Sequence, residues 1–341
     1  MNKKHIALFF GGKSSEHAIS ILSTRNIFQA LSKDKYTIYL VKIEKNGDFS
    51  LVSRDDLLSD RIYKGNFEKI SFGTIESKAC FEHPVTGAKI FIDVAIPILH
   101  GAFGEDGKIQ GYFETLNIKY VGCDTVASAL AMNKELAKQL VAIQGIDIAK
   151  FELLKRGESV DVAKVVAKLG LPIFVKPSCE GSSYGVSKVK NIEDLIPAIE
   201  EAFKFDKTVL LEECIVGREV ECGILGNREI EASEVGEVVT ADFYSYESKY
   251  ENDSAKIEIP ANLISEQRER VRSVAKKVYQ ILGCSGLSRV DFFLTPTRLV
   301  FNEVNTFPGF TNISMYPKLF EAVGIGYSEL LDKLIQLAVE R

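Results

Sequence analysis

Residues 288–317, SRVDFFLTPTRLVFNEVNTFPGFTNISMYP, predict a β-hairpin with polar side chains on one face. Two apolar runs flank a short connection, residues 295–297, whose proline favours a turn. Glu303 and Asn305 lie two residues apart and therefore share one face of the second strand. Folding the hairpin back brings Asp291 near that face, so we expect three oxygen-bearing side chains to converge there.

Two acids and one amide, with no histidine or cysteine nearby, suit Mg²⁺, which keeps waters and completes its shell with phosphate oxygens. The hairpin therefore predicts a nucleotide site. Residues 306–309 follow as a tight turn, in which Gly309 lets backbone N–H groups approach a bound anion while Arg289 supplies a permanent cation. A surface hairpin with solvated acids would show the same pattern, so the rest of the chain has to decide between the two interpretations.

The composition indicates an ordinary globular chain. Its 341 residues, 46% hydrophobic and 26% charged, can bury a large core and predict two or three domains. The net charge of −5 gives no overall basic field, so we expect no nucleic-acid partner. The apolar run after the N-terminus is too short for a signal peptide and no run is long enough to cross a bilayer, so we expect a cytoplasmic protein without a membrane partner. The cysteines form no C-x-x-C pair, which argues against a zinc site.

The first part of the chain predicts a βα unit and a parallel sheet. An apolar run at residues 6–10 precedes a glycine turn and a helix, but the turn lacks the first glycine of a phosphate-binding P-loop. Glu16 lies in this turn, either as a partner of the helix dipole or as a ligand. Residues 90–99 predict one central parallel strand, and His100 follows at its carboxyl end, where open α/β sheets bind ligands.

The middle of the chain places lysines beside a loop rich in glycine and serine. We expect one helix from residue 124 or 125 to residue 144, with Lys134 on it. A later apolar strand ends in Lys176, and the loop that follows contains Ser182 and Ser183. The N–H and hydroxyl groups of this loop could fold over phosphates, although its composition also suits a plain surface loop.

Two further segments suggest a nucleotide site and a lid. Residues 208–213 form an apolar strand that ends in two glutamates, and it could offer its backbone to an adenine edge and a carboxylate to the ribose or the amino group. Residues 236–260 are aromatic and charged but poor in aliphatic side chains, which favours a lid loop, with Lys249 and Tyr250 as its candidates for reaching a ligand. An amphipathic helix is expected at residues 265–282.

Five motifs resemble, in this order, those of the D-alanine–D-alanine ligases of the ATP-grasp superfamily, and the resemblance covers nearly the whole chain. They are GGKSSEHAIS (11–20), LHGAFGEDGKIQG (99–111), VKPSCEGSSYGVSKV (175–189), YSYESKY (244–250) and SRVDFF with NEVNTFPGFTNISMYP (288–317). The resemblance implies an α/β fold, the ATP-grasp fold, with the nucleotide between the central and C-terminal domains. Its three α/β domains would be residues 1–122, 123–211 and 212–341, the last with the lid loop 236–260.

The resemblance also implies a set of ligand-binding residues. ATP would donate the phosphoryl group, and two Mg²⁺ ions, which Mn²⁺ can replace, would bridge its phosphates; the family further suggests stimulation by K⁺. The residues that match the metal ligands are Asp291, Glu303 and Asn305. Those that match the ATP-binding residues are Lys134, Lys176, Ser183, Glu212, Glu213, Glu219 and Asn302.

By the same resemblance, the chain joins two D-alanines into D-alanyl-D-alanine for peptidoglycan precursors. The carboxylate of the first D-alanine attacks the γ-phosphorus, and the amine of the second then displaces phosphate from the acyl phosphate. The implied roles are as follows: Glu16 and His100 hold the first D-alanine, Lys249 and Ser314 hold the second, Arg289 and the Gly309 N–H hold the oxyanion, and Glu16, Ser182 and Tyr250 pin the lid.

Several alternatives remain at this stage. The second substrate could be D-serine or D-lactate, although the lysine–tyrosine pair at residues 249–250 is the one seen in enzymes that use D-alanine. Another ATP-grasp carboxylate–amine ligase would share the metal residues but lack the Glu16, Ser182 and Tyr250 set. A phosphotransferase and a non-catalytic nucleotide-binding module are further candidates. The family suggests a homodimer, and residues 55–85 have no assigned role.

Overall fold

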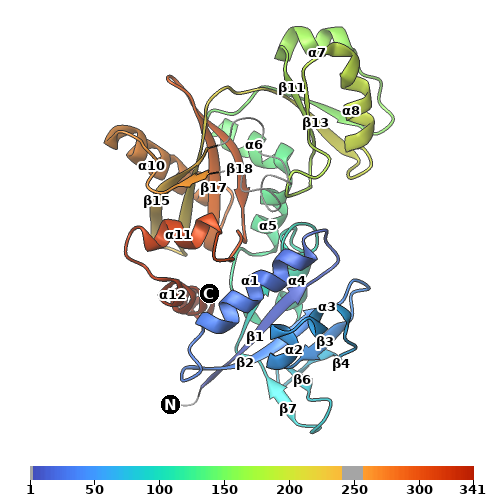
Figure 1. Cartoon of the computed structure of the whole chain (residues 1–341), viewed down its shortest axis with the longest axis vertical. Helices are drawn as coiled ribbons and strands as arrows, with labels where there is room; N and C mark the ends of the chain where they lie inside the picture. The colour runs from blue at the N-terminus through green and yellow to red at the C-terminus, as the bar shows by residue number, and fades with distance from the viewer. Residues whose placement is uncertain (1–2, 240–255) are drawn as a thin grey trace.

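The structure is a computed structural model that describes residues 3–239 and 256–341. Its strands form four sheets, of six, five, four and three strands. Figure 1 shows the N-terminal sheet at the bottom and the smaller unit that contains helices α7 (Val162–Leu169) and α8 (Leu195–Ala202) at the upper right. Within the two described ranges, no helix combines the length and the apolar character needed to cross a bilayer.

The N-terminal sheet has six strands and is parallel at its centre, as the sequence predicts. In order across the sheet they are β4 (Glu68–Ile70), β3 (Phe49–Val52), β2 (Tyr36–Ile43), β1 (Lys4–Gly11), β8 (Val94–Ile98) and β9 (Lys119–Tyr120). The central strands are buried almost throughout, which explains their near-continuous apolar sequences. The helices of this part are α1 (His17–Ala30), α2 (Arg54–Leu58), α3 (Arg61–Lys64) and α4 (Lys108–Thr115).

The predicted single strand at residues 90–99 is wrong, because the run divides between two sheets. Its first part lies in a separate antiparallel sheet made of β5 (Phe72–Ile75), β6 (Lys78–Glu82) and β7 (Lys89–Phe91). The break falls at Asp93, whose carboxylate accepts the His5 N–H at 2.7 Å and whose own N–H donates to the His5 carbonyl at 2.9 Å. The one charged residue of the run therefore marks the change of sheet.

The smaller unit is a four-stranded antiparallel sheet. Its strands, in order, are β10 (Phe151–Lys155), β13 (Thr208–Glu213), β11 (Ile173–Pro177) and β12 (Ser187–Val189). The pairing of β11 with β12 confirms the predicted strands on either side of the glycine- and serine-rich loop. Helices α7 and α8 bury Val165 and Ile199 in one cluster with the sheet, and the short turn η1 (Ile192–Asp194) precedes α8. The boundary expected between residues 211 and 212 falls inside β13.

The helix expected at residues 124–144 is two helices, α5 (Thr125–Met132) and α6 (Lys134–Ile143). Asn133 separates them with an extended backbone (φ −83°, ψ 97°), and its side-chain oxygen accepts the Leu136 N–H at 3.1 Å. Asparagine competes with helix continuation because it caps the following turn. As a result, Lys134 becomes the first residue of α6.

The C-terminal sheet contains five antiparallel strands, and the hairpin predicted from residues 288–317 is confirmed. In order, the strands are β16 (Lys256–Glu258), β15 (Ile230–Val239), β14 (Arg218–Gly226), β17 (Gly286–Leu294) and β18 (Leu299–Asn305). The register pairs Asp291 with Glu303 and Arg289 with Asn305. The helices are α10 (Ser265–Ile281), α11 (Met315–Glu321) and α12 (Tyr327–Glu340).

The structure describes both ends of the segment that was expected to be a lid loop, residues 236–260, and both ends contain strand residues. Residues 236–239 continue β15, and residues 256–258 pair with them as β16. The expectation that these flanks are loop is therefore wrong. Lys249 and Tyr250 lie outside the described residues.

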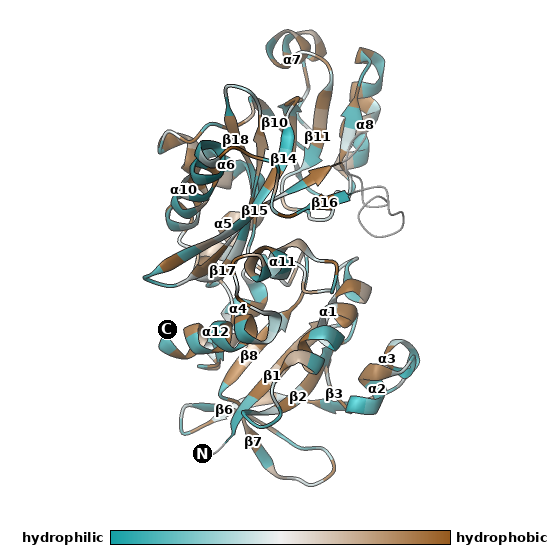
Figure 2. Cartoon of the chain, turned by 60° about the vertical axis from the view of Figure 1, so that its left-hand side comes forward, coloured by the Kyte–Doolittle hydropathy of each residue, from teal (hydrophilic) through white to brown (hydrophobic). Residues whose placement is uncertain are grey.

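Apolar contacts join the N-terminal and C-terminal parts of the chain. One buried cluster contains Ile6 of β1, Phe310 of the turn after β18 and Leu334 of α12. A second cluster lies between the five-stranded sheet and α10, which is mostly hydrophilic in Figure 2 but buries Val271 and Val278 against the sheet. The end of the chain thus fixes β18 and its following turn beside the N-terminal sheet.

Candidate active site

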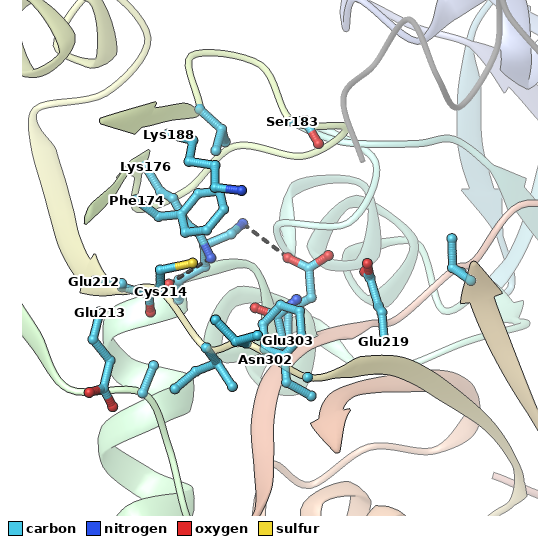
Figure 3. Close-up of a pocket in the computed structure, with 18 of the residues that line it drawn as sticks. Phe174, Lys176, Ser183, Lys188, Glu212, Glu213, Cys214, Glu219, Asn302 and Glu303 are labelled. Atoms are coloured by element: carbon cyan, nitrogen blue, oxygen red, sulfur yellow. Dashed lines mark ion pairs between the residues drawn. The ribbon is translucent and has the colours of Figure 1, made fainter. Parts of the chain in front are cut away.

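A cavity of about 490 Å³ lies where the four-stranded and five-stranded sheets face each other. Figure 3 shows Lys176 and Lys188 entering from the four-stranded sheet, and Glu219, Asn302 and Glu303 from the other side. The structure brings every residue expected to bind ATP to this cavity. Those residues are Lys134, Lys176, Ser183, Glu212, Glu213, Glu219 and Asn302.

Two lysines meet one glutamate in the wall of this cavity. The Glu212 carboxylate receives Lys176 Nζ at 2.6 Å and Lys138 Nζ at 2.9 Å, and all three side chains are largely buried. Burial alone would raise the pKa of Glu212, but the two lysines outweigh it and lower that pKa to about 2. Burial lowers the pKa of Lys138, whereas at Lys176 burial is outweighed by Glu212, which raises the pKa of that lysine. Lys176 therefore supplies a positive charge beside the cavity, which suits a phosphate-bearing ligand.

The structure gives Glu212 and Lys138 roles that the sequence reasoning missed. The Glu212 carboxylate was expected near the ribose or the adenine amino group, whereas both of its oxygens contact lysines. Lys138 was not singled out, although it lies one helical turn after Lys134. That spacing places both lysines on the same face of α6, so it was a usable signal.

Lys134 links the glycine- and serine-rich loop to the hairpin. Its ammonium group donates to the Glu180 carbonyl at 2.6 Å and lies 3.5 Å from the Glu303 carboxylate. This position follows from the helix break at Asn133, which starts α6 beside the loop. The lysine can therefore contact a phosphate held between the loop and β18.

A second cavity, of about 150 Å³, adjoins the first. The substrate, oxyanion and lid-pinning residues inferred from the resemblance converge here, apart from Lys249 and Tyr250, which lie outside the described residues. Its lining includes Glu16, His100, Ser182, Arg289, Gly309 and Ser314.

Glu16 and Ser182 close one side of this second cavity. Ser182 Oγ donates a hydrogen bond to Glu16 Oε1, although the two residues lie 166 positions apart in the chain. Ser182 and Ser183 both have positive φ angles, 47° and 62°, so the loop backbone is left-handed where it approaches Glu16. Gly101 lies against the same carboxylate with a φ of +69°, and a Cβ there would lie 2.5 Å from Glu16 Oε2, so a side chain at this position would displace Glu16.

Arg289 lies at the centre of an acidic group. Its guanidinium binds both oxygens of Asp291, at 2.8 and 2.7 Å, and contacts Glu221 at 2.8 Å. Burial lowers the pKa of Arg289, but the charges of Asp291 and Glu221 outweigh it and hold that pKa well above its ordinary value. Glu221 was not anticipated. It lies two residues after Glu219 in β14, with Val220 between them, so the two acids share one face of the strand; this is the same signal that identified Glu303 and Asn305.

Asp291, Glu303 and Asn305 lie together, as the hairpin predicted. The strand register sets Asp291 directly opposite Glu303, and the Asn305 amide N–H donates to Asp291 Oδ2 at 2.9 Å. Among residues 3–239 and 256–341, no three His, Cys, Asp or Glu side chains are grouped so that they could hold a metal ion. Besides Asp291 and Glu303, the third protein ligand would therefore be the side-chain oxygen of Asn305. Two carboxylates and an amide oxygen are donors that fit Mg²⁺ or Mn²⁺.

His100 and Glu105 connect the N-terminal sheet to the turn after β18. His100 is buried with Nε2 3.3 Å from Ser23 Oγ and Nδ1 3.3 Å from the Phe307 carbonyl, and burial lowers its pKa. Glu105, which the sequence reasoning missed, accepts the N–H groups of Gly101 at 2.9 Å and Phe307 at 3.1 Å. Burial and the nearby Glu16 charge raise the pKa of Glu105 to about 8.

Gly309 and Ser314 form the far wall of the second cavity. A Cβ at Gly309 would lie 2.8 Å from Ser314 Oγ, so a side chain at this position would displace the serine. Ser314 Oγ accepts the Thr311 N–H at 2.9 Å and holds the turn that precedes α11. The backbone around Gly309 therefore remains close to the cavity.

Comparison with known proteins agrees with this geometry. Residues 5–123 match the family described as D-ala D-ala ligase N-terminus, and residues 140–336 match the family described as D-ala D-ala ligase C-terminus. The chain belongs to the D-alanine–D-alanine ligase family. D-alanine–D-alanine ligase A of Chromobacterium violaceum is 43% identical over all of this chain and 96% of its own length.

Solved structures of this ligase family show the same fold. The D-alanine–D-alanine ligase of Coxiella burnetii superposes with a TM-score of 0.90 at 33% identity, over 100% of this chain and 95% of that one. VanG D-Ala:D-Ser ligase of Enterococcus faecalis gives a TM-score of 0.88 at 37% identity, over 99% and 100%. The D-alanine–D-alanine ligase of Bacillus anthracis, complexed with ATP, gives a TM-score of 0.76 at 29% identity, over 99% of this chain and 98% of that one. The expected α/β ATP-grasp fold is thereby confirmed.

Replacing Glu212 by Gln is expected to destabilise the protein by about 3–5 kcal/mol, because two buried lysines lose their counter-charge. Urea-induced unfolding measures the change. The matched control is Glu152→Gln in β10 of the same sheet, which removes the partner of the half-exposed Lys168 and should cost at most about 1 kcal/mol. Equal losses in the two variants would contradict the assigned role of Glu212.

Proposed function

We propose that this chain uses ATP to ligate two D-alanines, with release of ADP and phosphate, and so supplies D-alanyl-D-alanine for peptidoglycan precursors. The observation that supports this most strongly is the continuity of the two cavities, whose linings share Gly181, Ser182 and Glu303. A nucleotide in the larger cavity would therefore direct its terminal phosphate into the smaller one. The similarity to the Bacillus anthracis ligase supports ATP as the nucleotide.

The two cavities suit a two-step reaction. A carboxylate reacts poorly with an amine because its leaving group would be oxide. Transfer of the γ-phosphoryl group to the carboxylate of the first D-alanine gives an acyl phosphate, from which the amine of the second D-alanine displaces phosphate. Lys134, Lys176 and the N–H groups of the loop at residues 180–183 would hold the phosphates during the first step.

The smaller cavity provides groups for both amino acids and for the oxyanion. Glu16 would pair with the ammonium group of the first D-alanine, and His100 would lie beside its carboxylate; both residues line this cavity. The tetrahedral intermediate of the second step carries a negative oxygen, which Arg289 and the Gly309 N–H would stabilise. Ser314, together with Lys249, would hold the carboxylate of the second D-alanine.

We assign Asp291, Glu303 and Asn305 as the ligands of the two divalent cations that the family resemblance implies, because their side-chain oxygens suit such ions. Mg²⁺ or Mn²⁺ held by these residues would supply positive charge beside the phosphates. Arg289 and Lys134 contact Asp291 and Glu303 respectively, so the two acids keep counter-charges on the protein itself. The proposed homodimer and K⁺ stimulation stay predictions from the family, as does the cytoplasmic location.

We propose that the Glu16–Ser182 hydrogen bond is part of the closure over the site. This hydrogen bond joins the loop between β11 and β12, which contains Ser182, to the turn before α1, which contains Glu16. Tyr250 would add the third hydrogen-bonding side chain. Closure matters because water that reached the acyl phosphate would hydrolyse it. A division into three domains follows the same scheme, with the substrate and nucleotide between domains and with the second boundary after the end of β13, at residues 214–217.

Phosphate release should need ATP, Mg²⁺ and D-alanine together, and EDTA should abolish it. The product is identified by mass in a screen of D-alanine, D-serine and D-lactate as second substrate, because VanG is a D-Ala:D-Ser ligase of similar fold. We expect D-alanyl-D-alanine as the main product. Equal release with L-alanine would contradict the assignment.

Arg289→Lys should lower kcat by about 10²–10³-fold, because the lysine retains the charge beside Asp291 but cannot reproduce the guanidinium's bonds to the oxyanion. Binding of ADP, measured by calorimetry, should stay nearly unchanged. Arg289→Ala is the companion variant and should abolish turnover. If ADP affinity fell in parallel with kcat, Arg289 would be a phosphate ligand instead.

A further inference from the structure

The four-stranded sheet is connected to the rest of the chain by two crossings. The chain enters the sheet through residues 144–150, between α6 and β10, and leaves it through residues 214–217, between β13 and β14. Any change in the angle between this sheet and the five-stranded sheet has to bend these two crossings. Arg298, in the turn between β17 and β18, contacts residues at both.

The Arg298 guanidinium makes a bidentate pair with one crossing. Its Nε lies 2.7 Å from Asp147 Oδ2 and its Nη2 lies 2.9 Å from Asp147 Oδ1. Nη2 also donates to the Ile148 carbonyl at 3.1 Å. The remaining nitrogen, Nη1, lies 3.5 Å from the Glu213 carboxylate, at the start of the second crossing. One planar cation thus meets both crossings, which a lysine could not do with the same geometry.

The two crossings are also bonded to each other and to β18. Glu213 N–H donates to the Lys150 carbonyl at 3.0 Å, and Lys150 N–H donates to the Glu213 carboxylate at 2.9 Å. The Phe301 N–H of β18 donates to the Asp147 carbonyl at 2.8 Å. The two crossings, Arg298 and Phe301 therefore form one group that is joined by hydrogen bonds and ion pairs.

This group lies directly behind the nucleotide cavity. Ala149, Glu213 and Cys214 belong to the crossings or their ends and line the cavity, and Figure 3 shows Glu213 and Cys214 at its edge. Arg298 is not among the lining residues. It can affect a bound nucleotide through the crossings and through Glu213, whose carboxylate it contacts.

We propose that Arg298 is a positioning residue that holds the two crossings together and so fixes the width of the nucleotide cavity. The proposal rests on the proposed function only in taking the larger cavity as the nucleotide site. Without Arg298, the two sheets sample a wider range of angles, and the arrangement that binds nucleotide is a smaller fraction of the population. Apparent nucleotide affinity falls by that fraction, while the groups that act on D-alanine keep their positions.

Arg298→Gln is expected to raise the Kd for ADP and the KM for ATP by roughly 5- to 20-fold. The KM for D-alanine and the kcat at saturating ATP should change less than about twofold, because saturation restores the closed arrangement. Asp147→Asn should give the same pattern, and the double variant should be little worse than either single one. The Kd for ADP and the KM for ATP of Arg298→Lys should lie between those of the wild type and those of Arg298→Gln.

Arg272→Gln is the matched control. Arg272, on α10, has a similar exposure, 33% against 36% for Arg298, and contacts the Glu269 carboxylate and the Ala232 carbonyl. Unlike Arg298, it has no second carboxylate partner among the described residues and does not contact the two crossings. Thermal unfolding of both variants separates loss of stability from loss of affinity. The proposal is overturned if Arg298→Gln weakens ADP binding no more than Arg272→Gln does, or if kcat falls as much as affinity. Calorimetry with ADP needs no turnover, so absence of D-alanine-dependent activity in the wild type would instead refute the proposed function.

Discussion

The pairing of β17 with β18 is the constraint on which the active site depends. Its register sets Asp291 opposite Glu303 and Arg289 opposite Asn305, with an irregularity immediately after Asp291. Because side chains alternate across a strand, a shift of β18 by one residue would turn Glu303 and Asn305 to the other face of the sheet, away from Arg289 and Asp291. The register is held by apolar neighbours such as Phe292 and Val304, which are buried in the cluster that also contains Val271 and Val278 of α10.

Compensation of buried charge explains how these polar groups coexist with a packed core. A buried ion without a partner is very costly, whereas a bonded group of ions can be retained. Around Arg289 the partners are acids, and around Glu212 they are lysines. The site therefore has an acidic side on the five-stranded sheet and a basic side on the four-stranded sheet, which is the distribution that a metal-bound triphosphate between them would match.

Much of the site could be predicted because polar residues stand out within apolar strands. That signal identified Glu303 and Asn305, and it would also have identified Glu221 in β14. It fails where the decisive partner is distant in the sequence: the division of residues 90–99 depends on Asp93 bonding to His5, and the burial of Lys138 depends on Glu212. The prediction of one helix at residues 124–144 was wrong for a local reason: the Asn133 side chain caps the next helix and so ends the first one within a continuous helical pattern.

The central claim is that the acids of this hairpin hold the metal-bound phosphates next to Arg289. Crystals grown with ADP and Mn²⁺ test it most directly, because the anomalous scattering of manganese locates each ion independently of the protein. We expect anomalous peaks for manganese within bonding distance of the carboxylate oxygens of Asp291 and Glu303 and of the side-chain oxygen of Asn305. Manganese bound elsewhere in the presence of ADP, with these three side chains uncoordinated, would contradict it.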